Sequence, residues 1–290
     1  MSKVFNYLKY IKYSISNQKI ERSFNYKKYK EMLNRNISFQ NAYSGKRCFV
    51  LGNGPSLKTL DFSLLEKEIV FTVNQLPRNP QFDKLKTNFH FWADSRFFEL
   101  DENNEEDQEL LDVMKMVAHD GNNPFVFYEL DAIDMIKKYR LDEILNIYYF
   151  SLQPYDFATF VQKKAIDITK PMPNNPTVIH TIIAMAVDMG FSEIYLLGCD
   201  CTGFVNMPNA RLKKADTAEY NYKISENEKK RMEKVALQTS VRDELMSYVK
   251  LFDRYSLLLD YCNKHNVKLY NATKNSLLDS VPKVNLSDIL

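Results

Sequence analysis

Two carboxylates that directly follow apolar runs are the residues of this sequence best placed for acid–base chemistry. Asp94 follows the run 89–93, and Asp200 follows the run 194–199. A carboxylate or imidazole within hydrogen-bond reach of an acceptor hydroxyl can take its proton, and His180 is the third candidate for that role. A core histidine with a backbone partner is the alternative interpretation of His180, because its segment is apolar.

A glycine-rich turn after the apolar run 47–51 suits nucleotide binding. It reads Gly52, Asn53, Gly54, Pro55 and Ser56. Glycine lets backbone approach a ligand, the N–H groups of such a turn can face an anion, and Ser56 can cap the helix that we expect next. The turn is neither a dinucleotide fingerprint nor a Walker loop, because it lacks the third glycine and the Gly-Lys-Ser/Thr of these motifs. A tight connection without a ligand is the alternative.

The elements that must position these residues are short apolar runs separated by helical stretches. The runs end near residues 51, 73, 93, 128, 150, 199 and 270. This alternation predicts an α/β fold with a Rossmann-like, doubly wound, mostly parallel sheet. Ligands of such sheets bind outside the carboxyl ends of the strands. We therefore expect one edge of the sheet to carry the polar residues that end the runs, which are Asn53, Asn74, Asp94 with Ser95, Asp200 and Asn271.

A polar segment after Asp200 predicts a lid over that edge. The lid spans about residues 203–247, and the phenols of Tyr220 and Tyr222 can donate hydrogen bonds to a phosphate. Its basic residues Arg211, Lys213 and Lys214 can offset phosphate charge. An exposed loop whose tyrosines pack back on the domain is the alternative. Helices are expected at 178–189, closed by Gly190, and from 226 to about 265.

Composition limits the class of protein. The chain has 290 residues, of which 45% are hydrophobic, and it can bury one sizeable core. It has no run of about 20 apolar residues and no apolar signal-peptide core at its start, so we expect a cytoplasmic protein. The four cysteines lack the spacing of a zinc site or a redox motif and are expected to be reduced thiols.

A basic, aromatic leader precedes the predicted sheet. Residues 1–35 contain nine Lys or Arg and two Glu, whereas the rest of the chain is acidic. Such a segment can adhere peripherally to the inner face of the cell membrane, or it can pack on the domain as a helical hairpin. No nucleic-acid-binding motif accompanies it. We expect a helical leader at 1–45 and a nucleotide-sugar-binding catalytic domain at 46–290.

Four motifs in order carry a resemblance to a known family. They are Phe-Val-Leu-Gly-Asn-Gly-Pro-Ser-Leu-Lys at 49–58, Thr-Val-Asn-Gln at 72–75, Phe-Trp-Ala-Asp-Ser-Arg-Phe-Phe at 91–98 and Ala-x-x-Met-Gly-Phe-Ser-Glu-Ile-Tyr-Leu-Leu-Gly-Cys-Asp at 186–200. This set resembles the bacterial lipooligosaccharide sialyltransferases. It is similar also to the wider group of motility-associated flagellin glycosyltransferases and pterin pyrophosphokinase-like proteins. The resemblance covers residues 46–271 and omits the leader.

The resemblance implies a sialyltransferase-like variant of the GT-A fold and a cytidine nucleotide site. Within it, Gly52, Asn53, Gly54 and Ser56 meet phosphate and ribose, and Asn74 lies beside the transferred sugar. Pro55, Ser95, Tyr220 and Tyr222 complete the expected donor site. The chain departs from the sialyltransferases at Ala93, where they have asparagine, and at Thr177-Val178, where they have Ser-Gly. It also has no histidine between 203 and 247, where they place their base. Asp200, Asp94 and His180 are therefore the candidate bases, in that order.

The expected activity is transfer of a sugar from a nucleotide donor to a surface glycan such as lipopolysaccharide or capsule. The sugar is sialic acid or another nonulosonic acid linked to CMP, and the acceptor is a glycan or is lipid-linked. We expect no metal and no cofactor other than the donor, and no nucleic-acid partner; a homo-oligomer is left open. Two alternatives remain. One is a magnesium-dependent, pyrophosphokinase-like enzyme that uses ATP, with Asp94 and Asp200 as metal ligands. The other is a non-catalytic nucleotide-binding scaffold.

Overall fold

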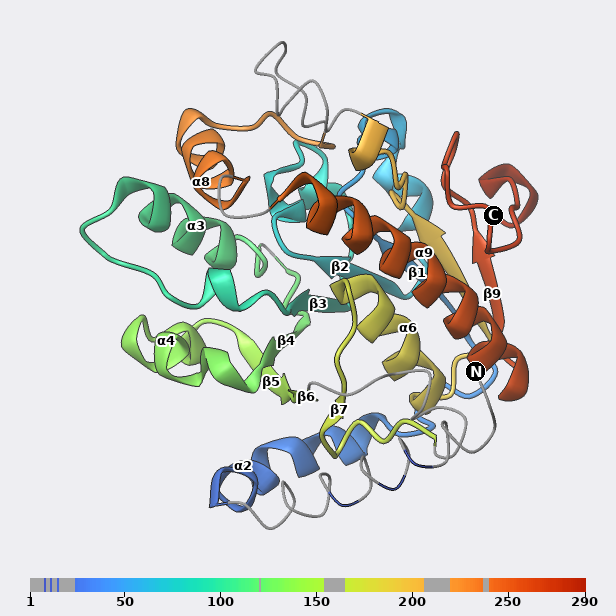
Figure 1. Cartoon of the computed structure of the whole chain (residues 1–290), viewed down its shortest axis with the longest axis horizontal. Coiled ribbons are helices and arrows are strands. Elements are labelled where there is room, and N and C mark those ends of the chain that lie inside the picture. Colours follow the sequence, from blue (N-terminus) through green and yellow to red (C-terminus); the bar gives the residue numbers. More distant parts are fainter. Residues whose placement is uncertain are drawn as a thin grey trace.

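A seven-stranded parallel sheet forms the centre of the computed structural model, which describes residues 8, 11, 15, 24–119, 121–153, 165–205, 220–236 and 240–290 (Figure 1). In spatial order its strands are β5 (Asn146–Phe150), β4 (Phe125–Glu129), β3 (Phe89–Trp92), β2 (Val70–Val73), β1 (Arg47–Leu51), β8 (Glu193–Leu197) and β9 (Lys268–Asn271). Every neighbouring pair is parallel. A second, two-stranded parallel sheet joins β6 (Leu152–Gln153) and β7 (Met172–Pro173). The predicted α/β, doubly wound, mostly parallel fold is confirmed.

The strand order reverses beside β1. From β1 the chain adds strands outward to β5, and it then returns to place β8 and β9 on the other side of β1. The register aligns Leu51 at the end of β1 with Leu197 at the end of β8. The turns that follow these two strands therefore leave the sheet next to each other.

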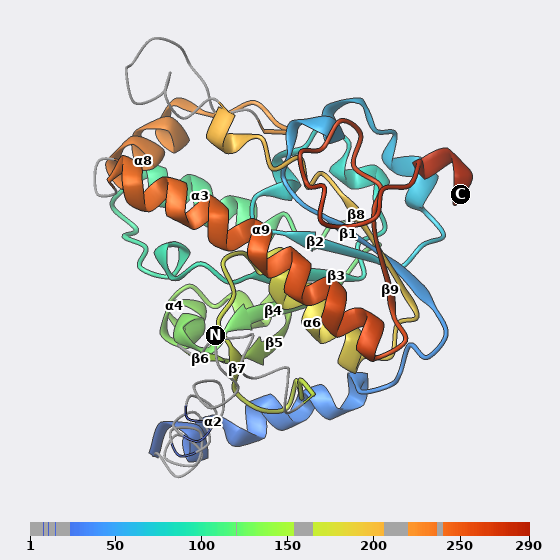
Figure 2. The ribbon, with the colours of Figure 1, turned by 45° about the vertical axis from the view of Figure 1, so that its right-hand side comes forward.

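Two helices cover one face of the sheet. They are α6 (Val178–Asp188) and the long α9 (Val241–Lys264), which cross the front of the sheet in Figures 1 and 2. Because side chains alternate along a strand, Val50 points toward these helices and Phe49 toward the opposite face. The first core also includes Phe71 and Phe89, whose rings stack with centroids 4.5 Å apart.

Shorter elements cover the other face. Helices α3 (Glu105–Lys115) and α4 (Ile133–Lys138) pack their apolar sides near Trp92 and Tyr128, and 3₁₀ helices cover the part around β1 and β2. In the described part of the chain, the 3₁₀ helices are Arg35–Phe39, Pro55–Thr59, Phe62–Leu65, Leu76–Arg78, Phe82–Lys84, Ser95–Phe97, Leu130–Ala132, Leu141–Glu143 and Leu286–Asp288. Both faces of the sheet are thus buried, as is usual for parallel strands.

The end of the expected leader packs against the free edge of β5. It forms α2 (Phe24–Asn34) and the 3₁₀ helix Arg35–Phe39. The fully buried Asn36 side chain donates to the carbonyl oxygens of Tyr149 and Ile168, each at 2.8 Å. Leu33 is also fully buried. Residues 24–39 thus pack on the domain, whereas residues 1–23, where the rest of the expected leader falls, lie outside the described residues except for positions 8, 11 and 15.

The expected helical region after residue 226 consists of two helices, α8 (Glu226–Ala236) and α9. The Ser240 side chain accepts a hydrogen bond from the Asp243 N–H and so caps α9. Of the predicted lid, residues 206–219, which include Arg211, Lys213 and Lys214, and residues 237–239 lie outside the described residues. The four cysteines are free thiols, as expected. Among the described helices, none is both long and apolar enough to cross a membrane.

Candidate active site

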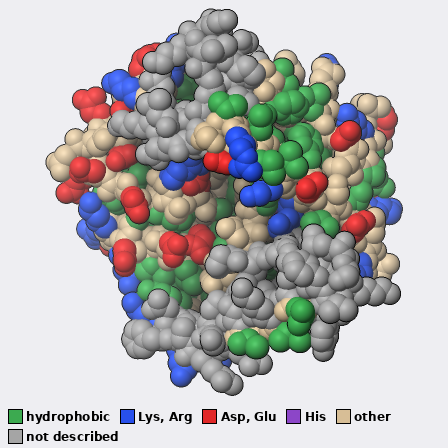
Figure 3. Space-filling model, viewed as in Figure 1, with side chains coloured by type: hydrophobic (Ala, Val, Ile, Leu, Met, Phe, Trp, Pro, Cys, Tyr) green, Lys and Arg blue, Asp and Glu red, His purple; other side chains and the backbone are tan. Residues whose placement is uncertain are grey.

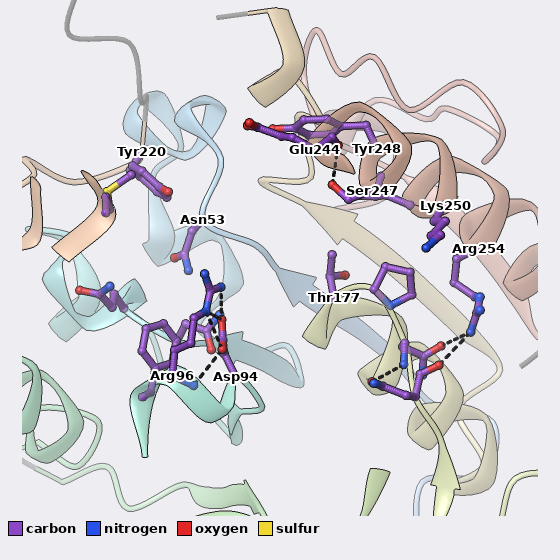
Figure 4. A pocket seen from close by; sticks show the side chains of 18 of the residues that line it. Asn53, Asp94, Arg96, Thr177, Tyr220, Glu244, Ser247, Tyr248, Lys250 and Arg254 are labelled. Atoms are coloured by element: carbon purple, nitrogen blue, oxygen red, sulfur yellow. Dashed lines mark hydrogen bonds and ion pairs between the residues drawn. The ribbon is translucent and has the colours of Figure 1, made fainter. Parts of the chain in front are cut away.

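A cavity of about 800 Å³ lies at the carboxyl ends of β1, β2 and β3. Its two sides come from different parts of the fold (Figure 4). The strand wall follows the three strands and contains Asn53, Asn74, Gln75, Asp94, Arg96 and Phe97. The helix wall comes from the start of α6 and from α9 and contains Thr177, Glu244, Ser247, Tyr248, Lys250 and Arg254. Tyr220, Tyr222 and Glu228 line it from the segment between β8 and α9.

Asn74 lines the cavity and has an unused acceptor. Its backbone has φ of 48°, a left-handed conformation that asparagine tolerates better than most residues. Its N–H donates to the carbonyl of Phe91 at 3.0 Å and so fixes the turn against β3. The Oδ1 atom of Asn74 is buried and has no partner among the described residues. A hydroxyl or amide of a ligand can supply the missing donor, since buried polar groups are normally paired.

Asp94 and Arg96 form a bidentate ion pair at the end of β3. Arg96 Nε lies 2.9 Å from each carboxylate oxygen, Arg96 Nη2 is paired with Oδ2, and the Arg96 N–H donates to Oδ1 at 3.0 Å. The carboxylate raises the pKa of the Arg96 guanidinium, and Tyr220 adds to this effect. Arg96 thus holds the Asp94 carboxylate in place at the lining of the cavity.

The tyrosine side of the cavity is tied to the glycine-rich turn. Tyr220 and Tyr222 stack with ring centroids 5.4 Å apart. Between them, buried Asn221 donates from its backbone and side chain to the oxygens of Asn53, both at 3.3 Å. Asn53 also donates from Nδ2 to the carbonyl of Val73 at 3.2 Å. The three loops therefore hold one another in place around the cavity.

The helix wall includes an arginine that contacts the segment before α6. Arg254 Nη1 donates to the carbonyl of Asn174 at 3.1 Å and to Asn175 Oδ1 at 2.8 Å. Thr177 precedes α6, and its hydroxyl lies 3.0 Å from Nδ1 of His180 rather than capping the helix.

His180 lies behind this wall and is fully buried in α6. Burial, together with the charge of Arg254, lowers the pKa of His180 to about 3. Its ring packs against Tyr255 with centroids 4.2 Å apart, and its Nε2 has no partner among the described residues. His180 is thus a neutral core residue that does not line the cavity.

The glycine-rich turn faces the protein rather than an open space. The N–H of Gly52 donates to Leu197 O at 2.8 Å, and that of Gly54 to Gly198 O at 2.9 Å. A Cβ on Gly52 would lie 2.5 Å from Gly198 O, and one on Gly54 would overlap the Asp200 carboxylate. The expectation that these glycines make room for a ligand is corrected: they make room for the turn after β8. Of the N–H groups in this turn, only that of Asn53 has no hydrogen-bond partner among the described residues.

Asp200 holds that same junction together. Its Oδ1 accepts from the N–H of Ser56 at 3.0 Å, and its Oδ2 accepts from Ser56 Oγ at 2.8 Å. Asp200 is 7% exposed and does not line the cavity. The expectation that Ser56 caps an α-helix is wrong, because a 3₁₀ helix begins at Pro55 and Gly54 is its N-cap.

The remaining sequence candidates divide between the cavity and its surroundings. Asn53, Asn74, Asp94, Tyr220 and Tyr222 come together in it. Gly52, Gly54, Pro55, Ser95, His180 and Asp200 do not line it. Ser56 faces a second cavity of about 630 Å³, and Asn271 is fully buried, with its side chain bonded to the backbone of Leu278 and Thr273.

Sequence reasoning missed the helix wall. Glu244, Ser247, Tyr248, Lys250 and Arg254 lie in a charged helix, and their spacing of three or four residues was the available signal that they share a face. Glu228, 6% exposed and bonded by Gln75 Nε2 at 2.8 Å, was also missed. No group of three His, Cys, Asp or Glu side chains among the described residues could hold a metal ion. Asp94 and Asp200 in particular do not fit a shared magnesium ion, because Arg96 and Ser56 engage them in separate places.

Comparisons with known proteins give one family and two similar structures. The family model described as 6-hydroxymethylpterin diphosphokinase MptE-like matches residues 23–204. The MAf glycosyltransferase from Magnetospirillum magneticum AMB-1 is 13% identical with a TM-score of 0.50; the match covers 90% of this chain and 38% of that protein. The sialyltransferase CstII from Campylobacter jejuni, solved with the substrate analogue cytidine-5'-monophosphate, is 19% identical with a TM-score of 0.44, over 83% and 85% of the two chains. No curated protein matched the sequence.

Proposed function

The chain belongs to the 6-hydroxymethylpterin diphosphokinase MptE-like family, and we propose that it is a glycosyltransferase that takes its sugar from a nucleotide donor. The observation that carries this proposal is the cavity of about 800 Å³ at the strand ends, whose lining residue Asn74 has a buried Oδ1 without a partner among the described residues. A cavity of this size is typical of small-molecule sites, and the hydroxyls of a sugar or ribose are suitable donors to Asn74.

The leaving phosphate would be stabilised from the strand wall and the tyrosine side. When the bond between the anomeric carbon and the phosphate oxygen breaks, its electron pair stays on the nucleotide, whose phosphate gains negative charge. Arg96 and the phenols of Tyr220 and Tyr222 are the groups of this chain that can meet that charge, together with the N–H of Asn53. Removing one well-placed donor of this kind costs roughly 2.7–4 kcal/mol of transition-state stabilisation.

Asp94 is the proposed general base. It takes the proton of the acceptor hydroxyl while the acceptor oxygen forms the new bond to the anomeric carbon. Of the three candidates from the sequence, it alone lines the cavity. The packing of Asp200 against Ser56 and of His180 in the core supports structural roles for those two residues.

The donor and acceptor classes follow from the resemblance in the sequence. We propose a CMP-linked sialic acid or another nonulosonic acid as donor, and a surface glycan such as lipopolysaccharide or capsule, free or lipid-linked, as acceptor. Peripheral contact between the basic leader and the inner face of the membrane would bring the enzyme to a lipid-linked acceptor. The cavity polarity supports a polar donor of this kind, whereas the fold alone is compatible with many reactions.

Diphosphoryl transfer from ATP is the second candidate, and the family match over residues 23–204 favours it. That reaction needs magnesium ligands near the phosphates. Since Asp94 and Asp200 do not fit as a shared pair, another set of carboxylates, such as Glu228 and Glu244 of the cavity, would have to serve.

Calorimetric titration with CMP, CDP, UDP, GDP and ATP, each with and without magnesium, tests the proposal. We expect CMP to bind without magnesium, and Asn74→Gly to weaken the binding of a CMP-linked sugar about tenfold, the loss of one hydrogen bond to the transferred sugar. Glycine keeps the positive φ at position 74, so the fold is preserved. Asn266→Gly is the matched control, because Asn266 also has a positive φ, of 58°, but lies outside the cavity. Tight ATP binding that requires magnesium would favour the diphosphokinase, and absence of nucleotide binding would favour a different function.

A further inference from the structure

A second cavity, of about 630 Å³, lies at the carboxyl ends of β1, β8 and β9. It lies between the 3₁₀ helix Pro55–Thr59 and the segment that follows β9. Ser56 lines this cavity, whereas Asn53 of the same turn lines the first one. A volume of this size is in the range of small-molecule sites. The same edge of the sheet therefore has two cavities, and the candidate active site uses one of them.

The two cavities differ in the charges that line them. The first is lined by acidic and basic side chains, and charges of both signs lie close together near the middle of the face shown in Figure 3. Among the described residues, the second is lined by two charged ones, Lys274 and Lys283. Asp200 and Asp288 contact other lining residues but do not line the cavity themselves. A recess whose lining is positive favours an anion.

The turn after β9 adds backbone donors to the two lysines. Asn275 has φ of 58°, a left-handed conformation. The N–H groups of Lys274, Asn275 and Ser276 have no acceptor among the described residues, although Ser276 is only 4% exposed. Successive N–H groups at a turn of this kind can form a concave site for anions such as phosphate. Lys283 lies beside them, because its Nζ donates to the carbonyl oxygen of Ser276 at 2.7 Å.

Apolar side chains form much of the remaining lining of the second cavity. They are Leu57, Leu60, Leu197, Ala272, Val284 and Leu286. All of them belong to, or pack against, the core on this face of the sheet. A free inorganic anion would leave this apolar surface in contact with water, whereas an organic group attached to the anion would cover it. The lining therefore favours a phosphate monoester over a free ion.

We propose that the second cavity binds a small molecule that carries a phosphate group and an apolar ring or chain. The phosphate lies against the N–H groups of residues 274–276 and the two lysines, and the organic group lies against Leu57, Leu197 and Leu286. The proposal is independent of the proposed glycosyltransferase function, because none of these residues lines the first cavity. It assigns a ligand site to the part of the sheet edge at β8 and β9.

Titration with phenyl phosphate and with inorganic phosphate tests the site. We expect phenyl phosphate to bind about tenfold tighter, because its ring covers apolar surface that inorganic phosphate leaves exposed. Either ligand should shift the amide resonances of Lys274, Asn275 and Ser276 in nitrogen-15 spectra of the protein. These shifts locate the phosphate group at the turn after β9.

Two variants with opposite charge provide the matched comparison. Lys274→Glu should weaken phenyl phosphate at least about tenfold, because it replaces attraction of the phosphate by repulsion. Lys274 is exposed and has no partner among the described residues, so the fold is kept. Lys67→Glu is the control, because Lys67 is also exposed but precedes β2, at the opposite edge of the sheet and outside both cavities.

Leu286→Ala separates the two parts of the ligand. It should weaken phenyl phosphate several-fold and leave inorganic phosphate unchanged, because Leu286 contacts only the organic group. The unchanged affinity for inorganic phosphate also shows that the cavity of the variant is still formed.

Four results would overturn the proposal. They are absence of phenyl phosphate binding, equal affinities for phenyl phosphate and inorganic phosphate, equal effects of Lys274→Glu and Lys67→Glu, and amide shifts confined to Asn53, Asn74 and Arg96 of the first cavity. Binding of phenyl phosphate at the turn after β9 by a protein that binds no nucleotide would support this site and contradict the proposed glycosyltransferase function.

Discussion

The loops after β3 and β8 both begin near an aspartate but use it differently. Asp94 lies at the cavity, where its carboxylate is shared between Arg96 and the open space. Asp200 lies at the point where the strand order reverses, and its carboxylate binds Ser56 of the neighbouring turn. In many parallel sheets the crevice at this reversal holds the ligand. Here the turns after β1 and β8 fill that crevice with their own atoms. The cavity lies beside it, at the carboxyl ends of β1, β2 and β3.

This difference shows that a carboxylate at a strand end does not by itself indicate catalysis. The nearest unsatisfied donors decide what the group does. For Asp200 they are an N–H and a hydroxyl of the protein, and for Asp94 one face of the group remains at the cavity.

The largest expected effect is a difference in turnover between variants of the two aspartates. Asp94→Asn should reduce transfer by roughly 10²- to 10⁴-fold, because an amide cannot accept the acceptor proton. Asp200→Asn and His180→Asn should each retain turnover within about tenfold. Release of CMP from a CMP-linked sugar measures all three variants. A greater loss in Asp200→Asn than in Asp94→Asn would reverse the assignment of the base.

The second effect concerns the close packing between the turns after β1 and β8. Gly54→Ala should lower the free energy of unfolding by about 3 kcal/mol, since its Cβ would overlap Asp200 and lie 2.6 Å from Gly198 O. Urea denaturation measures the change. Gly121→Asn is a suitable control, because nothing lies within 4 Å of a Cβ there and asparagine tolerates its positive φ. A Gly54→Ala variant as stable as the wild type would show that the junction is loose.

The third effect compares stability at the two strand ends. Asp200→Ala leaves the N–H of Ser56 without its acceptor and should cost about 2 kcal/mol. Asp94→Ala removes a partly exposed ion pair and should cost below about 1 kcal/mol. Urea denaturation of both variants at pH 7 decides between these values. Equal losses in the free energy of unfolding would mean that the two carboxylates stabilise the fold equally.

The smallest effect is a loss of stability at acid pH, which we expect from the strand that leads to Asp94. Burial lowers the pKa of His90, in the strand that leads to Asp94, to about 3. The unfolded chain binds a proton near pH 6.5, so this histidine's contribution to stability is complete above pH 6.5 and is lost as the pH falls toward 3. By pH 5.5 the loss is about 1.4 kcal/mol. His90→Gln should remove that part of the pH dependence, measured by urea denaturation at pH 7 and pH 5.5. An unchanged slope would contradict the lowered pKa.

The sequence predicted the sheet and one wall of the cavity well. Short runs of β-branched and aromatic residues, such as Phe89–Trp92, mark buried strands whatever lies beside them. In a parallel sheet the residues after such strands share one edge, which is why Asn53, Asn74 and Asp94 were expected together and are found together.

The rest depended on contacts between distant segments. The role of Gly54 is set by Asp200, and nothing near Gly54 in the sequence distinguishes a turn that holds a ligand from one that holds another turn. The helix wall depends on how α9 lies across α6, and Lys250 and Arg254 look like ordinary residues of a charged helix until that packing is known. These two residues could be identified as cavity residues only from the three-dimensional arrangement.

The contacts of the N-terminal segment with the β5 edge also constrain the order of folding. The buried Asn36 binds backbone oxygens 113 and 132 residues further along the chain, and Arg35 donates to Ile147 O, 112 residues away, at 3.2 Å. During synthesis this segment is made first, yet its partners are made only after half of the protein. Long-range closure of this kind slows folding, and until it happens the edge of β5 is open to pairing with another chain. A chaperone that covers either surface during this interval would therefore raise the yield of folded protein.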